Sequence, residues 1–213
     1  PYIKNKCIPA FGRQELKCYE RSLDVLFLPD VRMADYLPLS FARSEIFSLP
    51  PGGEEQDYPA RQFSPEGGIN LLYVGNIAPP IYDLRGYFAA GMKEENVRIK
   101  VITRERALKL HGSLYEFDDA CGPKVIHAQG QELHQHYQEA DIALCVWEGV
   151  EYHRFVMPVK VYESIAHGIP LIVSSSAEVL SRFVESERIG WVVQNSDEFA
   201  MLLRSCLLYT SPS

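Results

Sequence analysis

Residues 157–176 read MPVKVYESIAHGIPLIVSSS, and this stretch decides the fold. Pro158 suits the first position of a helix, because its missing N–H is not needed there and its φ angle is already helical. Gly168 suits the left-handed position that ends a helix. The run from Ile169 to Val173 is apolar without alternation, which is typical of a strand buried on both faces of a parallel sheet. The stretch therefore predicts a loop end, a short helix and a buried strand.

The helix predicted in this stretch has an apolar side and a polar side. The side that we expect to pack on the sheet carries Val159, Tyr162, Ile165 and Ala166. The opposite side carries, at helical spacing, Lys160, Glu163, Ser164 and His167. A lysine and a carboxylate thus stand together near a helix start, which favours anions. In a doubly wound sheet this place lies in the ligand crevice beyond the carboxyl ends of the strands.

The same two charges also have an ordinary explanation. Lys160 and Glu163 are three residues apart, so they can form a surface ion pair worth roughly 0.2–0.5 kcal/mol. With the lysine N-terminal to the glutamate, each charge opposes the helix dipole, and this order is the poorer one for a stabilising pair. Spacing alone does not decide whether Lys160 and Glu163 bind a ligand or form an ordinary surface ion pair.

Composition excludes several classes of function. The formal charge of −7 argues against broad, nonspecific nucleic-acid binding, although it leaves room for a local basic pocket. The five cysteines are scattered and never spaced as C-x-x-C, which favours reduced thiols in the cytoplasm over a disulfide framework or a zinc site. The sequence has no run of about 20 apolar residues, so we expect no membrane span. The start PYIKNK has neither an initiator methionine nor a signal peptide, so we expect a piece of a longer chain.

Strand and helix patterns alternate along most of the chain. Strands are expected at 23–28, 45–49, 70–74, 97–102, 124–127, 141–147, 169–173 and 190–193. Besides the helix described above, helices are expected at 14–21, 30–37, 82–92, 104–110, 131–139, 177–184 and 196–204. Asp30 and Ser196 are the expected N-caps of two of them. The alternation predicts an α/β fold with a Rossmann-like, doubly wound parallel sheet that carries helices on both faces.

The chain divides into four predicted segments. Residues 53–68 (GEEQDYPARQFSPEGG) are rich in Pro, Gly and charge without periodicity, so we interpret them as a linker. Residues 1–52 precede this linker, and the regular alternation occupies 69–206. The tail 207–213 (LLYTSPS) fits nothing before it, and we expect it to be a non-native remnant.

Two strand ends carry candidate phosphate contacts. Gly75 follows the first strand of the alternating region, where a glycine lets the backbone approach a phosphate or simply allows a tight turn. Arg104 and Arg106 follow the next strand, where a guanidinium can pair with a phosphate or remain solvated. G-x-G-x-x-G, Walker, G-x-S-x-G and H-E-x-x-H motifs are absent, so nothing predicts a dinucleotide site, a P-loop, a serine hydrolase or a zinc protease. We expect neither a metal nor a cofactor.

With these pieces placed, the chain resembles the nucleotide-sugar-dependent glycosyltransferases of the two-domain GT-B fold, in particular the large retaining group related to glycogen and sucrose synthases. The most specific match is PVKVYESIAHGIPLIV, which fits the pattern P-x-K-x-x-E-x-x-A-x-G-x-P-hydrophobic. YQEADIALCV resembles the helix, Ala-Asp and strand before the donor loop. YERSLDVLFLPDVRMADYL and IFSLPPG resemble the end of the N-terminal domain. The resemblance implies that residues 69–206 are the donor-binding domain and 1–52 a remnant of the acceptor domain.

The resemblance also implies a donor site. It consists of Gly75, Asn76, Arg104, Pro158, Lys160, Glu163 and Ser164. Glu163 would accept hydrogen bonds from the ribose hydroxyls and Lys160 would contact the diphosphate of a UDP- or GDP-linked sugar. Ser164 adjoins the ribose position. Gly75 and Asn76 would lie beside the diphosphate, and Arg104 would face the base or a phosphate. The resemblance names no catalytic residue, because a retaining transfer need not use a protein nucleophile.

One position departs from the family pattern. Many relatives carry a second glutamate eight residues before Glu163, and here that position is Phe155, which leaves Glu148 and Glu151 as the candidate substitutes. The departure keeps two alternatives open, a noncatalytic nucleotide-binding or scaffold module and a nucleotide-sugar epimerase. The expected partners are a nucleotide sugar, a glycan, lipid or small-molecule acceptor, and the remainder of the acceptor domain. We expect the 213 residues alone to be inactive in transfer.

Overall fold

The computed structural model describes residues 14, 18, 21–37, 45–52, 68–115 and 122–209. The chain forms two compact units, Pro1–Pro51 and Gly52–Ser213. The helix predicted at 14–21 and the linker predicted at 53–68 lie largely outside the described residues. Within the described ranges, no helix is long and apolar enough to cross a membrane.

The first unit contains a small parallel sheet. Strands β1 (Leu26–Leu28) and β2 (Ile46–Ser48) pair with Leu26 opposite Ile46, which confirms both predicted strands over shorter spans. Between them lies a 3-10 helix, η1 (Val31–Tyr36), rather than a longer α-helix. Its predicted cap is confirmed, because Asp30 Oδ1 accepts a hydrogen bond from Arg32 N at 2.8 Å.

The second unit is a six-stranded parallel sheet with helices on both faces, as the alternation predicted. Its elements are, in chain order, β3 (Ile69–Val74), α2 (Arg85–Gly91), β4 (Val97–Ile102), α3 (Glu105–His111), η4 (Gly112–Tyr115), β5 (Lys124–Ile126), α4 (Gln131–Glu139), β6 (Ile142–Cys145), η5 (Glu151–Phe155), α5 (Val159–Ala166), β7 (Leu171–Ser174), α6 (Glu178–Glu187), β8 (Gly190–Val193) and α7 (Ser196–Tyr209). The strand order is β5-β4-β3-β6-β7-β8.

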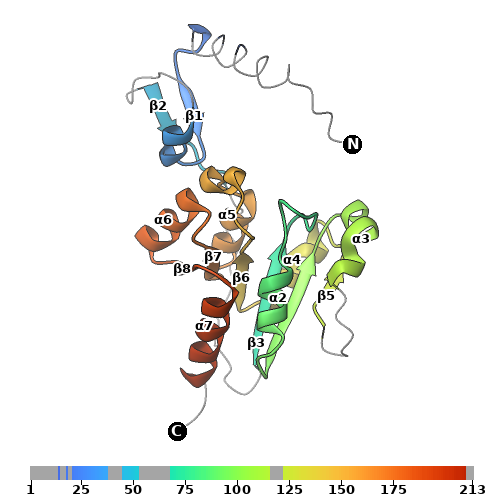
Figure 1. Cartoon of the computed structure of the whole chain (residues 1–213). Helices are drawn as coiled ribbons and strands as arrows, with labels where there is room; N and C mark the ends of the chain where they lie inside the picture. Colours follow the sequence, from blue (N-terminus) through green and yellow to red (C-terminus); the bar gives the residue numbers. More distant parts are fainter. Residues whose placement is uncertain are drawn as a thin grey trace. The chain divides into compact units, whose positions relative to one another are not determined.

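This order determines which helices share a face. Parallel crossovers are right-handed, so the connections from β3 outward to β5 place α2 and α3 on one face. The chain then returns past β3 to β6 and continues outward to β8, which places α4, α5 and α6 on the other face. Figure 1 shows α2 and α4 on opposite sides of the strands. Helix α7 packs against α2, where the rings of Tyr87 and Phe199 meet edge-to-face at 5.7 Å.

The core lies on both sides of the central strands. Leu71, Ile142 and Leu171 are almost completely buried, as expected for strands covered on both faces. Strands β7 and β8 approach so closely that a Cβ atom at Gly190 would lie 2.0 Å from the carbonyl oxygen of Leu171. Only glycine fits this first residue of β8 without a backbone shift.

Three local predictions are wrong. Pro158 has extended backbone (ψ 139°) and precedes α5, whose first residue is Val159. The cap of α7 is Asn195, whose Oδ1 accepts hydrogen bonds from Asp197 N and Glu198 N at 3.0 Å, and Ser196 is the first helical residue. Helix α7 also continues beyond Arg204 into the expected tail. The proposed foreign origin of that tail stays a prediction.

The predicted packing side of α5 is also wrong. Val159 and Ile165, expected to face the sheet, are 52% and 37% exposed. The residues that are buried instead are Val161, Ser164 and His167. The burial of the two polar residues is compatible with helix packing because each forms hydrogen bonds there, as described below.

Candidate functional site

The sheet reverses its winding between β3 and β6, which are hydrogen-bonded neighbours. In open α/β sheets such a switch point opens a crevice at the carboxyl ends of the strands. Gly75 and Asn76 directly follow β3, and Trp147 and Glu148 come soon after β6. The start of α5 follows on the chain from β6. The topology therefore brings the turn after β3 and the beginning of α5 to one edge of the sheet.

A chain of hydrogen bonds holds the turn after β3. Trp147 Nε1 donates to Tyr73 Oη at 3.1 Å, and Tyr73 Oη donates to the carbonyl oxygen of Asn76 at 2.7 Å. A Cβ atom at Gly75 would lie 2.8 Å from the same Tyr73 oxygen, so this position needs glycine. The exposed Asn76 folds its side chain back and accepts a hydrogen bond from Ala78 N at 3.2 Å. The turn is thus held by buried neighbours while Asn76 stays accessible.

Arg104 and Pro158 flank two of the helices at this edge. Arg104 is the exposed N-cap residue of α3 and follows β4, which is the strand next to β3. Pro158 is the half-buried residue immediately before α5. Both lie at the carboxyl edge of the sheet, as predicted. Their contacts with a ligand stay a prediction.

Lys160 and Glu163 meet on the first turns of α5. Lys160 Nζ lies 2.8 Å from Glu163 Oε1 and 2.7 Å from Oε2, and the two side chains are 37% and 29% exposed. The ion pair expected from the spacing is therefore present. It is half-buried rather than fully solvated, and both groups retain surface that a ligand can reach.

The Glu163 carboxylate has a second partner that the sequence did not indicate. Tyr137 Oη, from α4, donates to Glu163 Oε2 at 2.9 Å. Burial and the neighbouring carboxylate raise the pKa of the Tyr137 hydroxyl, so it stays protonated and acts as a donor. The carboxylate is thereby held between a residue of its own helix and one of α4.

A histidine pair continues this network between α4 and α5. The His167 ring stacks on the Tyr137 ring with centroids 4.5 Å apart, and its Nδ1 lies 2.7 Å from the carbonyl oxygen of Glu163. That contact requires a proton on His167 Nδ1, because a carbonyl only accepts. His167 Nε2 then accepts from His134 Nδ1 at 3.0 Å. The partners of Glu163 are therefore themselves fixed.

Ser164 is placed differently from the other predicted ligand residues. Its side chain is almost completely buried, and its Oγ donates to the carbonyl oxygen of Lys160 at 2.8 Å, within the same helix. A serine that bonds backward along a helix in this way satisfies itself without a ligand. Ser164 thus lies beside Glu163 in the sequence but points into the protein.

The loop between β6 and α5 is anchored by a buried histidine. His153 is completely buried and stacks on Trp147 with centroids 4.9 Å apart. Neither ring nitrogen has a hydrogen-bond partner within normal geometry among the described residues. Burial lowers the pKa of His153, and the nearby backbone of Glu148 opposes the shift in part. The ring is therefore neutral and fixes η5 by packing.

The carboxylates considered as substitutes at Phe155 have different surroundings. Glu151 is 82% exposed and pairs with Arg154 at 3.0 Å. Glu148 is exposed but lies against the start of α2, where its Oε1 is 2.9 Å from the position that a Cβ atom would take at Gly86. Phe155 itself meets Tyr152 edge-to-face at 5.6 Å. Of the two glutamates, Glu148 is the one beside the switch point.

Sequence reasoning thus found the charged pair but missed the groups that hold it. Tyr137 and His134, which lie within the helix predicted at 131–139, were assigned no role from the sequence. A histidine four residues after Glu163 on the same helix was the one available signal. Among the described residues, no group of three or more His, Cys, Asp or Glu side chains is placed to hold a metal ion.

The fold and the site geometry can now be set beside known proteins. The family described as Glycosyl transferases group 1 matches residues 68–208, about two thirds of the chain. The structure of TarM is similar with a TM-score of 0.67 and 10% identity, and the match covers 93% of this chain and 39% of TarM. The structure of WaaG, a glycosyltransferase involved in lipopolysaccharide biosynthesis, is similar with a TM-score of 0.59 and 15% identity.

The match with WaaG covers 87% of this chain and 54% of WaaG. The chain therefore spans about two fifths to about half of the length of these two proteins. At such low identity the similarity concerns the fold. No curated protein matches the sequence.

Proposed function

The chain belongs to the group 1 glycosyl transferases, which have the GT-B fold, and from this premise we propose that it binds a nucleoside-diphosphate sugar at the switch point of its large sheet. In this proposal, the second unit is the donor domain of a retaining glycosyltransferase. The observation that carries it is the Lys160–Glu163 pair, which lies on the helix after β6 and keeps surface open to a ligand.

Each proposed contact uses a group with suitable chemistry. The Glu163 carboxylate accepts hydrogen bonds from the two ribose hydroxyls, because an ionised carboxylate is an acceptor only and has lone pairs beyond those used by Lys160 and Tyr137. Lys160 turns from Glu163 toward the diphosphate. The N–H groups at the start of α5 and of the turn at Gly75 and Asn76 add positive potential there.

The same groups would assist the reaction. A departing nucleoside diphosphate gains negative charge in the transition state, and cations and N–H donors fixed beforehand stabilise that charge. Arg104 is proposed to contact the base or a phosphate from the end of β4. Because the chain covers only 39% of TarM and 54% of WaaG, the proposal places the acceptor-binding groups outside these 213 residues, which should bind nucleotide weakly without transferring sugar.

Calorimetric titration of UDP and GDP tests the proposal. Glu163→Gln keeps the shape and one acceptor oxygen but loses charge-assisted hydrogen bonds worth roughly 1.5–3 kcal/mol each. Affinity should fall by at least about tenfold, which corresponds to about 1.4 kcal/mol. An unchanged affinity in Glu163→Gln, beside measurable binding by the wild type, would end this assignment.

Lys160→Ala separates the diphosphate contact from the ribose contact. It should weaken UDP or GDP more than uridine or guanosine, because only the diphosphates carry the charge that Lys160 meets. The matched control is Lys109→Ala, which removes an exposed lysine that pairs with Glu105 on α3. Equal losses for nucleotide and nucleoside in Lys160→Ala would contradict the assigned role.

The aromatic ring at Phe155 favours a second candidate, a noncatalytic module that binds nucleotide without transferring sugar. Phe155 packs on Tyr152 and offers no carboxylate where many relatives have one. Product analysis with the longer protein distinguishes the two, since only the enzyme makes a glycoside.

A further inference from the structure

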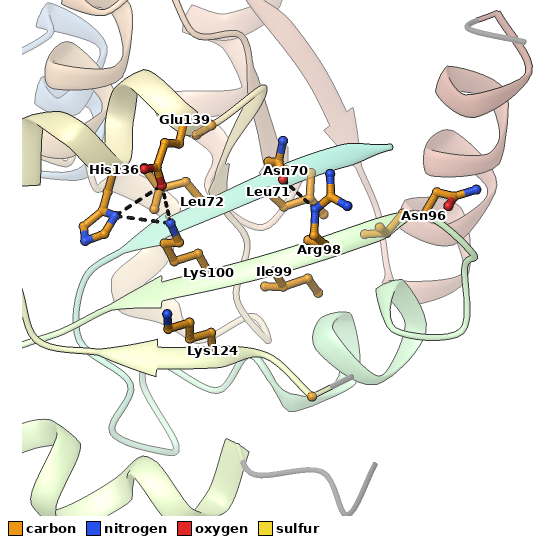
Figure 2. A pocket seen from close by; sticks show the side chains of 13 residues that line it. Asn70, Leu71, Leu72, Asn96, Arg98, Ile99, Lys100, Lys124, His136 and Glu139 are labelled. Carbon is orange, nitrogen blue, oxygen red and sulfur yellow. Dashed lines mark hydrogen bonds and ion pairs between the residues drawn. The ribbon is translucent and has the colours of Figure 1, made fainter. Parts of the chain in front are cut away.

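A pocket of about 550 Å³ lies between α4 and strands β3, β4 and β5, away from the crevice (Figure 2). It is formed by the first residues of the strands and the last turn of α4, so it lies toward the amino edge of the sheet. Its polar lining consists mainly of Asn70, Arg98, Lys100, Lys124, His136 and Glu139. The volume falls in the range of small-molecule sites.

Two lysines stand side by side in this pocket. Lys100 on β4 is in register with Lys124 on β5, so both side chains project from the same face of the sheet. Neighbouring strands are about 4.8 Å apart, and like charges directly opposite each other are destabilising. An anion bound between the two lysines would offset this repulsion.

The acidic groups of the pocket offset only one of these lysines. Glu139 pairs with Lys100 at 2.6 Å, and within the described part of the chain Lys124 has no ion pair. The residues that line the pocket thus include three cationic side chains and one carboxylate, in a protein whose formal charge is −7. The excess of positive charge is local.

His136 lies beside Lys100 and has one ring nitrogen without a hydrogen-bond partner among the described residues. Its Nδ1 lies 3.2 Å from Lys100 Nζ and 3.7 Å from Glu139 Oε2, so it can accept from the ammonium group or, when it carries the proton, face the carboxylate. The other ring nitrogen is Nε2. This atom is buried and has no partner among the described residues.

Arg98 is held in place at the other end of the pocket. Its Nε donates to Asn70 Oδ1 at 2.8 Å, and Asn70 in turn donates to Asp141 Oδ2 through both its backbone N–H and its amide group, at 2.8 and 2.9 Å. A guanidinium oriented in this way loses little freedom when it binds an anion. Figure 2 shows Arg98 beside Asn70 on neighbouring strands.

We propose that this pocket binds a phosphate-bearing small molecule, with Lys124, Lys100 and Arg98 contacting the phosphate. The site is separate from the proposed nucleotide-sugar crevice and does not depend on it. A lysine on an edge strand also deters pairing with other chains, which accounts for Lys124 by itself. It does not account for the in-register Lys100 and the fixed Arg98 in the same pocket.

The probe is inorganic pyrophosphate, titrated calorimetrically into the 213-residue chain. Lys124→Gln and Arg98→Gln should each weaken binding roughly fivefold or more, the scale of one lost charge-assisted contact. The control Lys109→Gln should leave it unchanged, and circular dichroism confirms that each variant is folded. The Lys160→Ala variant should still bind pyrophosphate, and this binding should still depend on Lys124.

Three results would overturn the proposal. They are no pyrophosphate binding by the wild type, equal binding by wild type and Lys124→Gln, and complete loss of binding in Lys160→Ala, which would place the anion in the crevice. Sedimentation with phosphatidylcholine vesicles, with and without phosphatidic acid, identifies the source of the phosphate. Vesicle binding that requires both phosphatidic acid and Lys124 would assign it to a lipid headgroup, and pyrophosphate binding alone to a soluble compound.

Discussion

On one face of the sheet α2 and α7 meet through aromatic and aliphatic side chains, whereas on the other face α4 and α5 meet through hydrogen-bonded polar rings. Tyr87 and Phe199 pack edge-to-face on the first, and a Cβ atom at Gly91 would lie 3.2 Å from Phe199 Cε1. On the second, Tyr137 and His167 stack on each other while both bond to Glu163. Both contacts are buried, but only the contact between α4 and α5 is built around a carboxylate, that of Glu163.

We infer from this difference that the apolar contact mainly stabilises the domain, whereas the polar contact mainly serves binding. Apolar packing contributes free energy that does not depend on pH or ligands. A buried polar network contributes less on balance, because each group gives up water to gain its partner. Under the two proposals above, the α4 face is the one that recognises ligands. The following variants test this separation.

The largest effect is expected on the apolar face. Phe199→Ala removes a completely buried ring between α7 and α2 and should lower the free energy of unfolding by about 3–5 kcal/mol. Nucleotide affinity of the folded protein should not change. Urea unfolding measures the first and calorimetry the second. Phe199→Leu, which leaves a smaller cavity, keeps the test informative if the alanine variant does not fold, and a loss of affinity there would contradict the separation.

On the polar face, Tyr137→Phe should affect binding more than folding. It removes the hydroxyl that holds Glu163, and one hydrogen bond worth about 1 kcal/mol corresponds to a roughly fivefold loss of UDP or GDP affinity. The matched control is Tyr115→Phe, which also removes a buried hydroxyl, one that donates to the carbonyl oxygen of Ile77. The control should lose stability but keep its affinity. Equal affinity losses in both variants would show a general effect of destabilisation.

Sequence patterns were sufficient to predict the strands of the large sheet, because a buried strand is recognisable from its own consecutive residues. Strands β4 and β8 have the predicted bounds, since continuous apolar or alternating runs between breakers leave little choice. The helix at 131–139 was also predicted with its observed bounds. Parallel pairing then follows from the alternation of strands and helices.

The orientation of α5 could not be predicted in the same way. Hydrophobicity placed Val159 and Ile165 inward, but the helix buries Ser164 and His167 because α4 provides partners for polar groups there. Such partners are distant in the sequence: Tyr137 and Glu163 are 26 positions apart. The periodicity of a single helix cannot predict a contact over that separation. The same holds for the cap at Asn195, where two adjacent polar residues compete and only geometry decides.

The pH dependence of stability tests the loop that leads into α5. Burial lowers the pKa of His153 below its ordinary value of about 6.5, so the unfolded chain binds a proton that the folded protein does not. The free energy of unfolding should therefore fall as the pH drops below about 6.5, down to the folded pKa. His153→Phe keeps an aromatic ring against Trp147 and should remove this part of the dependence. Identical pH profiles for urea unfolding of both proteins would contradict it.

The smallest effect concerns the stability contribution of the candidate site itself. Lys160 and Glu163 are partly exposed, and lysine precedes glutamate, so their coupling in a double-mutant cycle of Lys160→Ala and Glu163→Gln should be only about 0.2–0.5 kcal/mol. Gln is the suitable replacement because its amide oxygen still accepts from Tyr137, so no buried hydroxyl is left unpaired. The exposed Lys109–Glu105 pair on α3 provides the reference cycle. A coupling energy well above about 1 kcal/mol would show that the pair stabilises the fold. A small coupling energy, together with a tenfold loss of nucleotide affinity in Glu163→Gln, would show that the pair serves binding.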